Sequence, residues 1–312
     1  MNEVSFWSLF VGAGPSVAVL ALCTITLLFV VRRSRSLREI RRIRVLANRG
    51  DIDRAVRRLE PFLATVRKRS RAAYLAEWTA TDLWVTAGRY RRAVAGLRHV
   101  GRPRRLNTLD RHIYGIMQVN RAEALHNLGR DDLALRLLNR VDASVDLSPI
   151  ATNGSRALRA WILAHLGRGD DARKVLSALD PRPLSPTYAA ETHFTRSAME
   201  LCVGNLDAAK LEANRGLDCS VRASSQRNGL FLLGRIELAR GKIERARRHY
   251  ERGRSHRYRG QGGAALFELG SLYESLGERE AAVAVFREAI ERDPESFAVQ
   301  KCQQRLRAIA GA

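Results

Sequence analysis

The sequence predicts an all-α protein with a single N-terminal transmembrane helix, an α-solenoid of about seven helical hairpins and a C-terminal capping helix. Three observations lead to this prediction. Residues 6–31 carry no charged side chain, a glycine returns every 36 to 41 residues through the rest of the chain, and the helix formers Ala, Leu, Arg and Glu dominate the composition. Apolar residues make up 46% of the chain, which is enough to form a core.

The uncharged run at residues 6–31 is long enough to cross a bilayer. As a helix its 26 residues extend about 39 Å, against a hydrocarbon core of roughly 30 Å. A cleaved signal peptide has positive charge before its apolar part, whereas only Glu3 precedes this run. Residues 1–31 are therefore predicted to form a short N-terminus and a retained transmembrane helix.

A basic segment, residues 32–48, follows the predicted span. Positively charged flanks stay in the cytoplasm, so the N-terminus is predicted outside and the rest of the chain inside. Apolar residues recur every three positions from Leu37 to Leu46, as on one face of an amphipathic helix, and the arginines can contact anionic headgroups. These membrane-proximal arginines are Arg32, Arg33, Arg35, Arg38, Arg41, Arg42 and Arg44.

The glycine period extends from Gly50 to Gly277, and an alanine follows each of these glycines by five residues. A glycine that adopts positive φ ends one helix and turns the chain, while a small residue lets two helices cross closely. A single hairpin of this kind cannot bury its apolar face alone, so neighbouring hairpins stack into a solenoid. The pairs are Gly50–Ala55, Gly88–Ala93, Gly129–Ala134, Gly167–Ala172, Gly204–Ala209, Gly241–Ala246 and Gly277–Ala282.

The last unit, residues 264–294, resembles a tetratricopeptide (TPR) repeat over its whole length. The solenoid is predicted to cover residues 37–294, and residues 295–312, with an apolar stripe from Ala298 to Ile309, to cap it. The positions that carry the resemblance are Leu266, Leu269, Gly270, Tyr273, Gly277, Ala282, Phe286, Ala289 and Pro294.

The resemblance implies a scaffold that binds other proteins, because the first helix of each TPR hairpin lines a groove for a partner peptide or helix. Trp78 and Trp161 are the sharpest candidates, although core packing accounts for either tryptophan equally well. Carried over by register from the turn glycines, the groove residues are Leu75, Trp78, Asp82, Ile116, Glu123, His126, Asn127, Trp161, His165, Phe194, Asn228, Phe231, Arg235 and Phe267.

No pattern in the sequence indicates an enzyme. It contains no P-loop, no dinucleotide-binding glycine fingerprint and no H-E-x-x-H motif, and its seven histidines and four cysteines lack metal-ligand spacing. The chain is therefore predicted to be non-catalytic, with no metal and no cofactor.

The formal net charge of +22 leaves an alternative open. The basic residues are nearly all arginine, which arginine-rich codon usage explains best, yet a basic solenoid could also bind nucleic acid or anionic lipid. Residues 6–23 resemble the first helix of the proton-channel subunits in bacterial Tol and Ton systems. That resemblance implies a helix of the bacterial inner membrane with its N-terminus outside. With the basic flank, the chain is predicted to be a single-pass protein whose solenoid lies in the cytoplasm and assembles or regulates a complex.

Overall fold

The computed structural model describes residues 35–47, 49–66, 71–96, 108–143, 149–178, 186–221, 223–256 and 262–311. The predicted transmembrane residues 6–31, with Arg32 and Arg33, lie outside these ranges. Among the helices that are described, none combines the length and the apolar character needed to cross a membrane.

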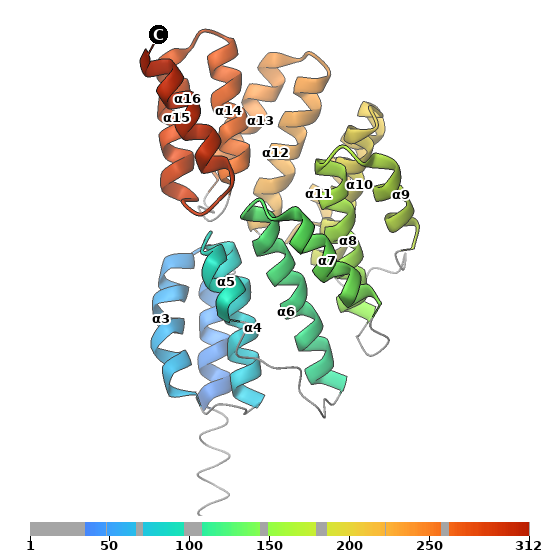
Figure 1. Cartoon of the computed structure of the whole chain (residues 1–312), viewed down its shortest axis with the longest axis vertical. Helices are drawn as coiled ribbons and strands as arrows, with labels where there is room; N and C mark the ends of the chain where they lie inside the picture. The colour runs from blue at the N-terminus through green and yellow to red at the C-terminus, as the bar shows by residue number, and fades with distance from the viewer. Residues whose placement is uncertain are drawn as a thin grey trace, which may run out of the picture.

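The described part of the chain is helical, as predicted, and its helices form consecutive hairpins (Figure 1). A helix at residues 35–47 pairs with α3 and opens the solenoid, so the predicted amphipathic segment forms the first helix of the first hairpin. The remaining helices are α3 (Ile52–Thr65), α4 (Arg71–Thr86), α5 (Tyr90–Gly96), α6 (Thr108–Asn127), α7 (Asp131–Asp142), α8 (Pro149–His165), α9 (Gly169–Ser177), α10 (Pro186–Cys202), α11 (Leu206–Cys219), α12 (Ala223–Ala239), α13 (Ile243–Arg254), α14 (Gly263–Ser275), α15 (Arg279–Arg292) and α16 (Ala298–Gly311).

The turn inside each hairpin is built around the predicted glycine. All seven of these glycines have positive φ, from 70° at Gly241 to 86° at Gly50. The seven alanines that follow are each 0% exposed, which confirms that these positions pack at the crossing of the two helices. At Gly88 the backbone N–H groups of Gly88 and Arg89 donate to the carbonyls of Val85 and Trp84, so the turn satisfies the last carbonyls of α4.

Small residues let the two helices of a hairpin approach closely. A Cβ placed on Gly270 in α14 would lie 2.5 Å from the ring of Phe286 in α15, and one on Gly234 in α12 would lie 3.0 Å from the ring of Tyr250 in α13. Both rings are fully buried. Each glycine therefore makes the space that an aromatic side chain of the second helix fills.

The first helices of successive hairpins form the inner face of the solenoid. Helix α4 packs on α6, α6 on α8, α8 on α10 and α10 on α12, while each second helix packs on the first helix of its own and of the next hairpin. The second helices are thereby displaced to the outer face. At the C-terminal end α16 packs on both α14 and α15, with Cys302 fully buried between them.

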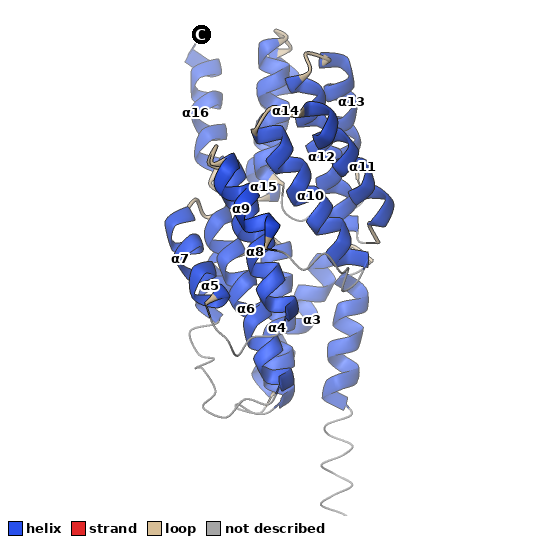
Figure 2. Ribbon diagram, turned by 90° about the vertical axis from the view of Figure 1, so that its right-hand side faces the viewer, coloured by secondary structure: helices blue, strands red, loops and turns tan. Residues whose placement is uncertain are grey.

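The solenoid curves until its end returns to its beginning. In Figure 1 the chain rises from α3–α5 at the lower left, passes through α6–α11, and brings α14–α16 back above α3–α5; Figure 2 shows the same stack from the side. Residues 293–297, here called the closing segment, make this contact. The sequence placed the start of the capping helix at Glu295, whereas α16 begins at Ala298 because the preceding residues bridge to the early hairpins.

Three hydrogen bonds tie the closing segment to the early hairpins. Two of them reach residues about 200 positions earlier in the chain, and the third reaches a residue 170 positions earlier. Tyr90 Oη donates to Asp293 Oδ2 over 3.1 Å, and the backbone N–H of Arg91 donates to Glu295 Oε2 over 2.6 Å. The backbone N–H of Phe297 donates to the carbonyl oxygen of Asn127 over 2.9 Å. These bonds join the last hairpin to α5 and α6.

Asp293 is the centre of this closure and is almost fully buried. Besides Tyr90, its Oδ2 accepts from the backbone N–H of Gly263 at the start of α14, over 3.1 Å. Burial raises the pKa of the Asp293 carboxyl above its usual range, although these hydrogen bonds and the charge of the buried Arg227 oppose the rise. A Cβ on Gly88 would lie 2.8 Å from Asp293 Oδ1, so glycine is needed at that turn for close approach as well as for its φ.

Candidate functional site

Polar side chains from four hairpins converge on the inner face. They come from α6, from the start of α7, from α8, and from α12 and α14, which are far apart in sequence. Such convergence requires strong curvature, since Arg235 on α12 reaches His165 on α8 across the hairpin that lies between them. We call this group the inner cluster; its members are His126, Asp131, Trp161, His165, Arg235 and Glu268.

Arg235 is held in a fixed orientation within the inner cluster. Its Nε donates to Glu268 Oε2 over 2.6 Å, and its Nη2 lies 2.5 Å from Glu268 Oε1, which is a two-point contact between planar groups. Tyr250 Oη donates to the same Oε2 over 3.0 Å. Burial and the neighbouring Glu268 both raise the pKa of the Tyr250 hydroxyl, so Tyr250 stays protonated and able to donate.

His165 is neutral in this arrangement. Its Nδ1 lies 3.0 Å from the carbonyl oxygen of Trp161, and its Nε2 lies 2.8 Å from Arg235 Nη1. Only a ring with its proton on Nδ1 can donate to the first group and accept from the second. His165 as a residue is exposed, but desolvation of its ring by the surrounding protein, together with the Arg235 charge, lowers the pKa of His165 to about 3.

Aromatic rings surround the polar groups. The Trp161 ring lies 4.5 Å from the His165 ring between centroids, and the His126 ring meets His165 edge-on at 5.9 Å. Phe297 of the closing segment approaches His126 at 6.4 Å. Lys301 Nζ on α16 lies 5.4 Å from the centre of the Phe297 ring and 5.8 Å from that of Phe267. Aromatic surface beside fixed polar groups is typical of sites that recognise a protein segment.

The structure brings several of the predicted groove residues together. His126, Trp161, His165 and Arg235 all belong to the inner cluster. Asn127 follows His126, its side chain donating to the Glu123 carbonyl oxygen over 3.0 Å while its own carbonyl accepts from Phe297. Asn228 is exposed on α12, seven residues before Arg235 and therefore on the same side of that helix.

Other predicted groove residues lie elsewhere. Phe194 is 3% exposed and Phe231 is 6% exposed, and both pack in hydrophobic core clusters outside the inner cluster. Each ring lies against a glycine of the same or the following hairpin, which is the packing role of an aromatic in this solenoid. Trp78 is partly buried beside Ile113 and Met117, and the Arg44 guanidinium stacks on its ring at 4.4 Å. Asp82 is partly buried on α4 and takes no part in the inner cluster.

Sequence reasoning missed four residues of this region. Asp131 accepts from His126 Nδ1 over 2.6 Å and Glu268 orients Arg235, yet both read as ordinary surface carboxylates in the sequence. Phe297 and Lys301 were assigned to the cap. The sequence clue to this part of the site was Phe297, an aromatic residue three positions after Pro294, because the repeat pattern does not account for it.

The polar groups of the inner cluster already have partners within the protein. Its carboxylates are already paired with His126 and with Arg235, and the neutral His165 is hydrogen-bonded at both nitrogens. In the part of the chain that the structure describes, no group of three or more His, Cys, Asp or Glu side chains could hold a metal ion.

The lowered pKa of His165 predicts a pH dependence. A base whose pKa falls from 6.5 to about 3 on folding binds fewer protons when folded, so its contribution to stability is complete above pH 6.5 and is lost as the pH falls toward 3. We expect thermal unfolding of His165→Gln to depend less steeply on pH between 6.5 and 4 than that of the wild-type protein. Parallel melting curves for the two proteins across this range would contradict the assignment.

Comparisons with known proteins agree with the fold. The tetratricopeptide repeat family matches residues 231–297, and a second description of the same repeat matches residues 40–61 and 154–177. No curated protein matches the chain. A solved tetratricopeptide repeat protein from Parabacteroides merdae is 14% identical, with a TM-score of 0.51, and the match covers 88% of this chain and 98% of that one.

Two further solved structures have a similar fold at low identity. A Rap protein complexed with competence and sporulation factor is 12% identical, with a TM-score of 0.55 and coverage of 84% of this chain and 77% of that one. A chain of the APC/C hetero-tetramer Cut9–Hcn1 is 11% identical, with a TM-score of 0.51 and coverage of 85% and 48%. The chain thus carries tetratricopeptide repeats and folds as an α-solenoid of that kind.

Proposed function

We propose that this tetratricopeptide-repeat protein is a membrane-anchored scaffold whose inner face binds a segment of a partner protein, to assemble or regulate a complex at the bacterial inner membrane. TPR proteins generally mediate protein–protein interaction. The observation that carries the proposal is the inner cluster, in which side chains of four hairpins meet on the inner face. One neighbour of similar fold was solved in complex with a factor, which supports the same use of the fold.

The inner cluster is prepared for binding before a partner arrives. The two-point contact with Glu268 fixes the Arg235 guanidinium, and the neutral His165 is fixed by its two hydrogen bonds. Fixed side chains lose little conformational entropy when a partner binds. The partly buried Trp161 offers apolar surface beside them, so a partner segment with an apolar anchor flanked by hydrogen-bonding groups fits this surface.

Two observations support the proposed membrane anchor. The first is the uncharged run at residues 6–31. The second is the helix at residues 35–47, whose exposed surface carries arginines together with the apolar residues Leu37 and Val45. Arginines beside exposed apolar residues suit contact with anionic headgroups at a bilayer surface. Ile40 and Ile43 of the same helix are buried, and Ile43 packs in one cluster with residues of α3.

Copurification tests the scaffold function. The tagged full-length protein, purified from its own cells in mild detergent, is expected to retain a defined set of proteins that a folded Trp161→Ala variant loses. If the variant retains every partner of the wild-type protein, the inner face is not the binding surface. If no protein copurifies with either form, the scaffold function itself is contradicted.

Membrane fractionation tests the anchor. We expect the full-length protein to stay in the membrane pellet after an alkaline carbonate wash, because an apolar helix is released only by detergent. The solenoid is expected to resist added protease in intact spheroplasts and to be digested after lysis, since the basic flank places it inside. Release by carbonate would contradict a spanning helix, and digestion in intact spheroplasts would contradict the orientation.

A further inference from the structure

Helix α13 is the most basic of the described second helices. Its twelve residues contain five arginines and one histidine against two glutamates. Two of those arginines have partners, because Arg247 pairs with Glu278 and Arg254 pairs with Glu288. No carboxylate of the described residues pairs with the other three, Arg245, Arg248 and Arg252, and all three are exposed.

These three arginines form a row. At 100° per residue Arg245, Arg248 and Arg252 fall within about 60° of one another around the helix. Lys242, exposed at the N-cap of α13, extends the row, which is about 15 Å long at 1.5 Å per residue. We call these four residues the α13 row. The exposed Glu244 beside them leaves a net charge of +3 (four positive, one negative).

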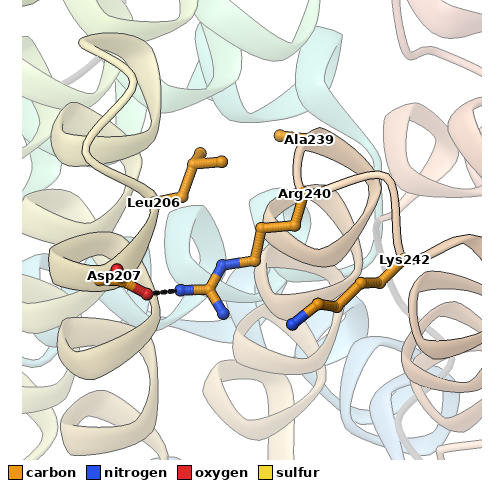
Figure 3. Close-up of a pocket in the computed structure, with 5 residues that line it drawn as sticks. All are labelled: Leu206, Asp207, Ala239, Arg240 and Lys242. Carbon is orange, nitrogen blue, oxygen red and sulfur yellow. Dashed lines mark hydrogen bonds and ion pairs between the residues drawn. The ribbon is translucent and has the colours of Figure 1, made fainter.

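Further cations border the α13 row at its N-terminal end. A shallow pocket between the α10–α11 and α12–α13 turns is lined by Leu206, Asp207, Ala239, Arg240 and Lys242. In Figure 3 the Lys242 amine extends into this pocket beside Arg240, whose guanidinium pairs with Asp207. The buried Glu237 pairs with Lys210 at 2.6 Å, and the charges of Lys242 and Arg245 also help to lower the pKa of this carboxyl.

We propose that the α13 row binds the phosphate backbone of a nucleic-acid duplex. One strand of a duplex carries about four phosphates over about 15 Å of its axis. The α13 row has the same length and carries four cations. The row offers no aromatic ring on which unpaired bases could stack. Ile243, the exposed apolar residue of α13, is nine residues from Arg252 and therefore on the opposite side of the helix, so the row also lacks the apolar anchor that a protein partner needs.

The position of α13 favours a nucleic acid over a lipid surface. The first hairpin, which continues from the proposed anchor, lies at the lower end of the molecule in Figure 1, whereas α13 lies at the upper end. A bilayer beside the first hairpin is thus remote from the row. The proposal is independent of the inner cluster, because α13 is a second helix on the outer face.

Salt-dependent binding tests the proposal. The probe is a fluorescent 20-base-pair DNA duplex, titrated with the full-length protein in nonionic detergent between 50 and 200 mM salt. Four phosphate contacts predict that log K falls with log salt with a slope of about −4. For the Arg245→Gln, Arg248→Gln, Arg252→Gln variant we expect the slope to become shallower by about 3 and the affinity at 50 mM salt to fall about tenfold or more.

A second triple variant separates the row from net charge. Arg136→Gln, Arg140→Gln, Arg287→Gln removes three exposed arginines on α7 and α15 and is expected to bind the duplex nearly as well as wild type. Equal losses of duplex affinity in the two variants would mean that binding depends only on overall charge, and this would overturn the proposal. The absence of duplex binding by the wild-type protein at 50 mM salt would also overturn it. The last comparison measures binding of the same proteins to vesicles that contain 30% anionic lipid. If the α13 variant loses vesicle binding and keeps duplex binding, the row contacts lipid and the proposal fails.

Discussion

Asp293→Ala is expected to destabilise the protein by about 2–5 kcal/mol. The substitution removes the acceptor that the buried Tyr90 hydroxyl and the Gly263 N–H share, together with a carboxylate whose pKa the charge of the buried Arg227 lowers. Because these groups belong to α5, α14 and α12, the loss falls on the contact that closes the solenoid. A clear fall in melting temperature of the full-length protein in mild detergent would show it.

Two further substitutions serve as controls for Asp293→Ala. Asp170→Ala removes an aspartate whose side chain is 84% exposed, and it is expected to alter stability by less than about 0.5 kcal/mol. Tyr90→Phe removes one of the two hydrogen bonds to Asp293 Oδ2 and is expected to cost about 1 kcal/mol. If Asp293→Ala melts like Asp170→Ala, the closing segment does not hold the two ends together.

Trp161→Ala is expected to weaken partner binding by about 2–4 kcal/mol, which is roughly a 30-fold to 1000-fold loss of affinity. The Trp161 ring lies 4.5 Å from the His165 ring between centroids, and it is partly buried against the neighbouring core cluster. The measurement is the dissociation constant for the copurified partner, determined below the melting temperature of the variant.

Trp78→Ala is the matched control for Trp161→Ala. It removes the same side chain from α4, where the ring packs against Ile113 and Met117 and lies under Arg44, away from the inner cluster. We expect a loss of stability with little loss of partner affinity. Equal losses of affinity in the two variants would mean that binding does not depend on the inner cluster.

The sequence predicted the hairpins well because their signals are local. Each turn needs a residue with positive φ and each helix crossing needs a small side chain, so Gly277 and Ala282 report the geometry of their own hairpin. Aromatic residues were harder to place. Phe194 and Phe231 have the register of groove residues, but the glycines opposite them, Gly216 and Gly253, open space for their rings in the core.

The closure of the solenoid could not be predicted from the repeat pattern. Asp293 stands at the end of a repeat, where a carboxylate before a proline indicates only a turn. Its partner Tyr90 is 203 residues away, and their meeting depends on the accumulated curvature of five intervening hairpins. Small rotations at each hairpin set that curvature, and they depend on side-chain packing that no short motif reports.

Site-specific photocrosslinking in cells tests the central claim most directly. A photoreactive amino acid at Asn228, exposed on the inner side of α12, is compared with the same amino acid at Leu211, exposed on the outer helix α11. We predict a discrete crosslinked partner from position 228 that is lost when Trp161→Ala is added, and no such product from position 211. A partner captured at position 211 and absent at position 228 would contradict binding on the inner face.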